Sequence, residues 1–210
     1  SQVMVSQTSM TVCYDANDED DMSFLLGIGC GGIIHLLLQP LGSHNNYLQL
    51  PAVLEALEKR QSFILLQKIT RDGESSKATF LAKKSENYDL LEARLGAKKA
   101  LLTVVSEQTC LAIRIIPPRH LLVVGGGVDA RPLANMAATL GWDITLCDPR
   151  PANARREHFM DVCTILRCQP LSLDEEPLFE YFDAAIVMTH NLQFDADAII
   201  CLQKSNIKYL

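Results

Sequence analysis

Apolar residues in the C-terminal half of the chain form short continuous runs separated by stretches of helical spacing. The continuous runs predict strands at residues 121–124, 144–147, 184–188 and 207–210. Helical spacing between these runs predicts helices at residues 130–140 and 195–203. Strands that alternate with helices form parallel sheets with helices on both faces, so this half is predicted to have an α/β fold.

The N-terminal half has a more mixed pattern, which predicts a smaller α+β domain. Its strands are predicted at residues 10–14, 33–38, 62–68, 77–82 and 109–116. The run at residues 33–38 is continuously apolar and stops at Gln39-Pro40, which predicts a buried strand. A turn at residues 71–74 is predicted to join two of these strands as a hairpin.

A helix is predicted at residues 47–59, with Asn46 placed to cap its start. Its apolar face is formed by leucine and valine side chains at helical spacing: Leu50, Val53, Leu54 and Leu57. The charged segment at residues 85–99 favours neither helix nor strand. Between the two halves lies Pro117-Pro118, which favours extended linker backbone and predicts domains at residues 1–117 and 118–210.

A glycine turn joins the first strand and first helix of the C-terminal half. The run at residues 121–124 ends in Gly125-Gly126-Gly127, and the next apolar run ends at Asp148. Strand, glycine turn, helix, strand and acid, in that order, are typical of a Rossmann-like dinucleotide-binding domain. Gly125 and Gly127 fit the positions where a Cβ would block the turn and the approach of a ligand.

Polar residues at the expected strand ends are the candidate ligand contacts of this domain. Asp148 is placed to accept hydrogen bonds from a ribose diol, and Arg150 to pair with a phosphate. Thr189 and His190 follow the strand predicted at residues 184–188, on the ligand side of a parallel sheet. His190 as a helix cap or a surface residue is the alternative. Asp129, at the start of the helix, favours a second alternative, in which the pocket is empty or altered.

A second glycine-rich turn surrounds Cys30. Gly27, Gly29, Gly31 and Gly32 lie within six residues around this thiol. Successive glycines let backbone N–H groups converge into an anion-binding nest, which favours the thiolate form of a cysteine held there. A thiolate is a nucleophile or a soft metal ligand. The alternative is a glycine-rich bend that carries a small buried residue.

Composition narrows the classes of function. The formal net charge of -6 argues against a nucleic-acid partner, and no apolar run approaches the length of a membrane span. The seven cysteines contain no Cys-x-x-Cys pair, which disfavours a structural zinc site and favours a reduced, cytoplasmic compartment. Neither a Tyr-x-x-x-Lys pair nor an ATP-binding P-loop motif is present.

Several segments together resemble the XdhC/CoxI family. They are GIGCGGIIHLLLQPL at residues 27–41, PPRHLLVVGGG at 117–127, LCDPR at 146–150 and DAAIVMTHN at 183–191. These segments keep the order that they have in the family and are spread over most of the chain, from residue 27 to residue 191. Two features depart from the family: Val128-Asp129 replaces a His-Val pair, and the resemblance implies a chain shortened at both ends.

The resemblance implies an accessory factor for xanthine dehydrogenase-type molybdoenzymes. Such factors bind molybdenum cofactor (molybdopterin), protect it while a cysteine desulfurase supplies sulfur, and deliver it to the enzyme as homodimers. Carried over by position, Cys30 with Gly29, Gly31 and Gly32 would handle the cofactor, with Cys30 as a metal ligand. The C-terminal pocket would be lined by Gly125, Gly127, Asp148 and Arg150, with Thr189 and His190 beside it.

Two other hypotheses remain open beside this non-enzymatic carrier. The segment from Leu122 to Gly127, with Arg131, also resembles the nucleotide turn of precorrin-2 dehydrogenases, which favours an NAD-dependent oxidoreductase. A third hypothesis is an interaction module that keeps the fold without binding a ligand.

Overall fold

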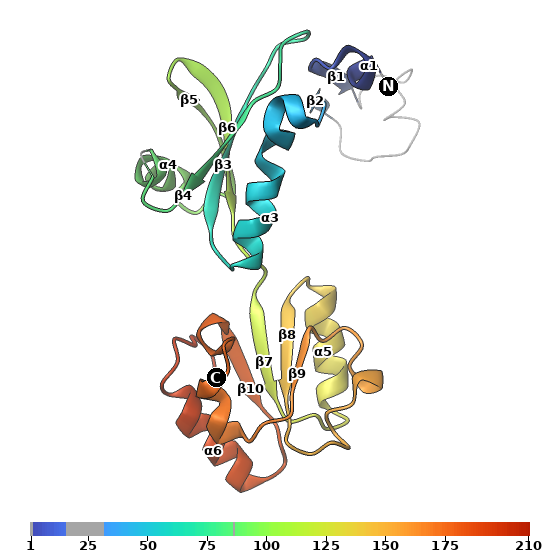
Figure 1. Ribbon diagram of the computed structural model, residues 1–210, viewed down its shortest axis with the longest axis vertical. Coiled ribbons are helices and arrows are strands. Elements are labelled where there is room, and N and C mark those ends of the chain that lie inside the picture. The colour runs from blue at the N-terminus through green and yellow to red at the C-terminus, as the bar shows by residue number, and fades with distance from the viewer. Residues whose placement is uncertain (1, 16–31, 86) are drawn as a thin grey trace. The chain divides into compact units, whose positions relative to one another are not determined.

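The computed structural model describes residues 2–15, 32–85 and 87–210 (Figure 1). Contacts divide the chain into two compact units, residues 1–117 and 118–210. The described part of the first unit contains α1 (Gln2–Ser6), β1 (Met10–Asp15), β2 (Ile33–Leu38), the 3₁₀ turn η1 (Ser43–Gln49), α3 (Leu50–Glu58), β3 (Phe63–Lys68), β4 (Ala78–Ala82), α4 (Tyr88–Leu95), β5 (Ala100–Val105) and β6 (Gln108–Ile115).

An antiparallel sheet is the centre of this first unit. Its strand order is β4-β3-β6-β5, and α4 packs on one of its faces. Strand residues that alternate toward α4 form the core with Tyr88, Leu91 and Leu95 of the helix. The charged segment at residues 85–99 therefore contains a helix, whose apolar positions face the sheet while its charges face solvent.

Two predictions for this unit need correction. The strand at residues 33–38 is present, but it is mostly exposed, since within the described residues it pairs only with β1 in a two-stranded sheet. The helix predicted at residues 47–59 begins at Leu50, after η1, and Asn46 lies inside η1 with φ +50°. Pro51, in the first turn of α3, favours a helix start at that point.

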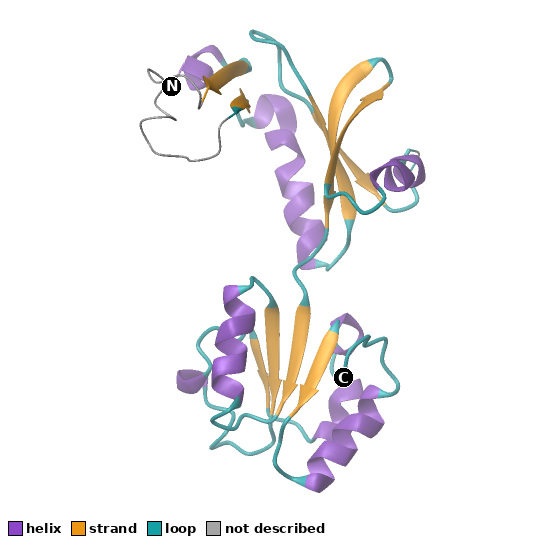
Figure 2. Ribbon diagram, turned by 180° about the vertical axis from the view of Figure 1, so that it is seen from behind, coloured by secondary structure: helices purple, strands orange, loops and turns teal. Residues whose placement is uncertain are grey.

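The second unit contains a parallel sheet flanked by helices (Figure 2), whose four strands have the order β10-β7-β8-β9 (Figure 1). Its elements are β7 (His120–Val124), α5 (Ala130–Thr139), β8 (Asp143–Cys147), η2 (Arg156–His158), β9 (Thr164–Leu166), η3 (Pro170–Glu175), η4 (Phe179–Tyr181), β10 (Ala184–Val187) and α6 (Leu192–Leu202). The predicted Rossmann-like α/β fold is confirmed. The strand predicted at residues 207–210 is reduced to one isolated bridge, between Ala184 and Tyr209.

Both faces of this parallel sheet are covered. Leu121 and Val123 of β7 pack toward α5, whereas Leu122 and Val124 pack toward α6, η3 and η4. Every residue of β7 is buried, as expected for a central parallel strand. Of the helices in the described part of the chain, none is long and apolar enough to cross a membrane.

Candidate functional site

The glycine turn between β7 and α5 lies at the carboxyl edge of the parallel sheet, as predicted. Gly125 has φ +113°, and a Cβ placed on it would lie 2.5 Å from the carbonyl oxygen of Met188. Its N–H donates to the carbonyl oxygen of Cys147, at 2.8 Å. Only glycine allows this left-handed turn and this close approach to the residue that follows β10.

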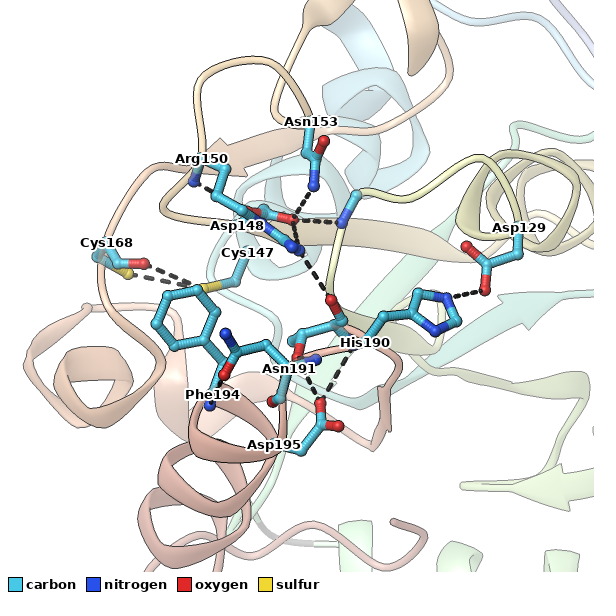
Figure 3. A network of polar contacts seen from close by, with 12 residues as sticks. Asp129, Cys147, Asp148, Arg150, Asn153, Cys168, His190, Asn191, Phe194 and Asp195 are labelled. Atoms are coloured by element: carbon cyan, nitrogen blue, oxygen red, sulfur yellow. Dashed lines mark hydrogen bonds and ion pairs between the residues drawn. The ribbon is translucent and has the colours of Figure 1, made fainter.

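Asp148 is the centre of a hydrogen-bond network at this edge (Figure 3). Its buried carboxylate accepts hydrogen bonds from the N–H of Gly126 at 2.8 Å and from the side chain of Asn153 at 3.1 Å. Arg150 donates to it three times, from its backbone N–H at 2.9 Å and from Nε and Nη2 at 2.8 Å each. A carboxylate has about four lone-pair sites, so these five donors leave none for a ribose diol.

The electrostatics of this network favour the ion pair. Burial raises the pKa of Asp148, but the hydrogen bonds from Arg150, Gly126 and Asn153 outweigh it and hold the pKa below its ordinary value. The hydrogen bond to Asp148 in turn raises the pKa of Arg150. Arg150 also donates to the carbonyl oxygen of Thr189 and lies over the ring of Phe194, 5.8 Å from its centroid. Arg150 therefore connects the end of β8 to the loop after β10.

Thr189 organises the start of α6. It is buried, and its hydroxyl donates to Asp195 Oδ1 at 2.6 Å. The same carboxylate oxygen accepts the backbone N–H of Thr189. Asn191 caps the helix, with its side-chain oxygen accepting the N–H groups of Gln193 and Phe194. The predicted polar cluster after β10 is thus a helix-start motif bound to the Asp148 network through Arg150.

His190 and Asp129 form an exposed pair beside the glycine turn. His190 Nε2 lies 2.7 Å from Asp129 Oδ2, which joins the loop after β10 to the start of α5. The hydrogen bond with His190 lowers the pKa of Asp129, and the backbone N–H groups of Asp129 and Ala130 lower it further. A Cβ on Gly127 would lie 2.5 Å from Asp129 Oδ1. The Asp129 carboxylate therefore lies at the start of α5, where a ligand phosphate would bind in a Rossmann turn.

The structure brings together all six predicted C-terminal residues: Gly125, Gly127, Asp148, Arg150, Thr189 and His190. The predicted turn around Cys30, with Gly29 and Gly31, lies outside the described residues. Gly32 is half-buried in a bend with φ +150°. Sequence reasoning missed Gly126 and Asn153, because a backbone N–H in a turn and an amide in a loop carry no periodic signal.

Among the described residues, no group of three or more His, Cys, Asp or Glu side chains is arranged to hold a metal ion. The carboxyl edge instead offers one solvent-accessible acid–base pair, Asp129 with His190. Asp148, by contrast, is enclosed by its own donors. The exposed Asp129 and His190 can present a polar surface to a ligand. The buried Asp148 instead holds together the loops at the carboxyl edge of the sheet.

Comparison with known proteins gives this geometry a context. Residues 121–210 match the family model described as XdhC Rossmann domain. A protein of Bacillus subtilis (strain 168), named as a probable subunit of xanthine dehydrogenase, is 29% identical over 209 residues, which are 97% of this chain and 62% of that protein.

A crystal structure from Bacillus halodurans, described as a xanthine dehydrogenase, has a TM-score of 0.74 at 23% identity. The match covers 100% of this chain and 63% of that one, and it shows that the two proteins share a fold. The chain thus spans 62–63% of the length of these two relatives.

Proposed function

We propose that this chain, whose residues 121–210 match the family model described as XdhC Rossmann domain, is an accessory factor for xanthine dehydrogenase-type molybdoenzymes. In this proposal it binds molybdenum cofactor and assists its sulfuration and its insertion into the enzyme. The observation that carries the proposal is the family match over the whole parallel-sheet unit. The Bacillus subtilis relative, whose name refers to xanthine dehydrogenase, supports it across nearly the whole chain.

The turn around Cys30 is the proposed cofactor contact. A thiolate would be a suitable ligand for molybdenum, and the sequence predicts that the glycines on either side of Cys30 would offer backbone N–H groups that favour negative charge. When bound, the cofactor would supply the molybdenum centre that the partner enzyme requires. The role of the chain itself is to hold the cofactor, exclude water from it and release it to the enzyme.

The carboxyl edge of the parallel sheet fits a cofactor phosphate poorly in its present arrangement. The Asp129 carboxylate lies at the start of α5, and its negative charge would repel a phosphate bound at that helix start. Arg150 is engaged by Asp148 and Thr189. We therefore propose that the accessible residues of this edge, Gly127, Arg150 and His190, form a contact surface for the non-phosphate part of a ligand, and that the buried Gly125 and Thr189 support this surface from within.

The hydrogen bonds within the Asp148 network also bear on the alternative of an NAD-dependent oxidoreductase. NAD binding in a Rossmann domain uses the acid at the end of the second strand to hold the ribose diol. In this chain that acid is Asp148, whose lone pairs are taken up by Gly126, Arg150 and Asn153. This supports the carrier over the oxidoreductase.

The test is to purify the full chain from cells that produce molybdenum cofactor and to measure bound pterin by fluorescence and bound molybdenum by mass spectrometry. The proposal expects both in the wild-type protein and a loss of both in Cys30→Ala. Cys13→Ala is the matched control, because Cys13 is an exposed thiol of the same unit and belongs to no proposed site.

Three results would contradict the proposal. Cofactor retained in Cys30→Ala would remove this thiol from the site. NAD(H) binding at low millimolar concentration, with no pterin, would favour the oxidoreductase. Neither ligand in the wild-type protein would favour an interaction module. Cysteine desulfurase, a xanthine dehydrogenase-type enzyme and a second copy of the chain are the proposed partners, to be tested by co-purification and by light scattering.

A further inference from the structure

Two cysteines of the second unit lie against each other. The Sγ atoms of Cys147 and Cys168 are 3.8 Å apart (Figure 3). Cys147 is the last residue of β8 and is fully buried, whereas Cys168 follows β9 and is half-buried. Their sequence separation gives no sign of this pairing, which arises because β8 and β9 are adjacent parallel strands.

The environments of the two thiols differ in a way that suits stepwise exchange. The hydrogen bond from Cys147 lowers the pKa of Cys168. The same hydrogen bond, together with burial, raises the pKa of Cys147. Of the two sulfurs, the more accessible one is therefore the one at which the thiolate form is favoured, and a thiolate is the form that attacks disulfides. The buried sulfur is placed directly behind it.

We propose that Cys147 and Cys168 form a reversible thiol–disulfide modification site whose oxidant is a low-molecular-weight disulfide. The Cys168 thiolate attacks one sulfur of this disulfide, which forms a mixed disulfide and releases one small thiolate. The Cys147 sulfur then attacks Cys168 Sγ and forms the internal disulfide, while its proton passes to the departing second small thiolate, which leaves as a thiol. Two protein thiols are oxidised and one small disulfide is reduced to two thiols.

The position of this pair gives the modification a structural consequence. Cys147 immediately precedes Asp148, and the N–H of Gly125 donates to the carbonyl oxygen of Cys147. A disulfide bond is about 2.05 Å long, so closure shortens the 3.8 Å separation of the two Sγ atoms and fixes the end of β8 covalently to the loop after β9. The proposal rests on this sulfur geometry and is independent of the proposed carrier function.

The test uses the full chain, fully reduced and then incubated with oxidised glutathione, followed by peptide mapping under non-reducing conditions. The expected product is a peptide pair linked through Cys147 and Cys168. Cys163, an exposed thiol of the same unit, is the internal control and is expected to yield only a mixed disulfide. Linkage of Cys168 to another cysteine, or no internal linkage, would overturn the proposal.

Two variants separate the steps. Cys147→Ser removes the second thiol and is expected to leave a stable glutathione adduct on Cys168. Cys168→Ser is expected to remove the internal link without any adduct on Cys147, because Cys147 is buried. In the wild-type protein, oxidation is expected to slow alkylation of Cys168 by at least about tenfold, and a reductant is expected to restore it. Equal alkylation rates before and after oxidation would contradict the internal disulfide.

Discussion

The two four-stranded sheets of this chain use their apolar residues differently. In the antiparallel sheet of the first unit, residues along the edge strand β5 alternate between exposed and half-buried. In the parallel sheet of the second unit, every residue of β7 is buried. When both faces of a sheet are covered, its polar functional side chains lie at the ends of the strands. The Asp148 network lies at such an end.

One of the two largest expected effects comes from removing Asp148, the shared hydrogen-bond acceptor at the carboxyl edge of the parallel sheet. Asp148→Ala leaves Arg150, Gly126 and Asn153 without their shared acceptor, so the second unit is expected to lose about 3 kcal/mol of stability. Urea denaturation followed by Trp142 fluorescence measures this, because Trp142 is the only tryptophan and belongs to that unit. Asp161→Ala, at an exposed position of the same unit, is the control. Equal midpoints for the two variants would show that the network does not stabilise the unit.

A pair of leucine substitutions tests the difference in burial between the two sheets directly. Leu122→Ala in β7 creates a cavity at a site with no solvent exposure and is expected to cost about 3 kcal/mol. Leu102→Ala in β5 removes a side chain that is 63% exposed and is expected to cost about 0.5 kcal/mol or less. Hydrogen exchange of the full chain, read separately for each unit by mass spectrometry, compares them. Similar losses for the two variants would contradict the difference in burial between the two sheets.

Acid is expected to weaken the parallel-sheet unit through Asp148. Its pKa in the folded state is below that of the unfolded chain, which is about 3.9. The charged carboxylate therefore stabilises the fold above that pH, and this contribution is lost as the pH falls through the lower folded-state value. The stability gap between wild type and Asp148→Asn, measured by urea denaturation, is expected to narrow under acid. If this difference in stability widened under acid, the pKa of Asp148 would be raised by folding, and the assigned direction of the shift would be wrong.

The smallest effect on stability is expected at the exposed Asp129–His190 pair. Asp129→Asn keeps the shape of the side chain and removes the negative charge, so the denaturation midpoint is expected to stay unchanged. The affinity of the full chain for pyrophosphate, measured by calorimetry, is expected to rise severalfold. Asp129→Glu, which keeps the charge, is the control and is expected to bind pyrophosphate as weakly as wild type. Unchanged affinity in Asp129→Asn would show that Asp129 does not exclude phosphate.

The sequence predicted the parallel-sheet unit well because its signals are local. The apolar runs, the glycine turn and the acid at residues 121–148 follow one another within a single strand–helix–strand unit, and the structure has them in that order. The partners of Asp148 were not predictable in the same way. Gly126 and Asn153 reach it from two loops, and only the folded chain brings those loops together.

The first unit shows where pattern reasoning fails. The apolar run at residues 33–38 predicts burial, yet Ile33 is 56% exposed, because burial depends on what packs against a strand as well as on its composition. The helix α4 was not predicted, because its sequence is rich in charged residues, although Tyr88, Leu91 and Leu95 have helical spacing. The three apolar positions were too few among the charged residues of this segment to indicate a helix.

The strand order β10-β7-β8-β9 has a consequence for synthesis of the chain. β7 is the first strand of its sheet to be made, but one of its two neighbours, β10, is the last. Until Ala184–Val187 has left the ribosome, one edge of an entirely buried strand has no hydrogen-bonding partner. Chaperone binding or aggregation of the nascent chain is expected to concentrate in this interval, after the first unit has been completed.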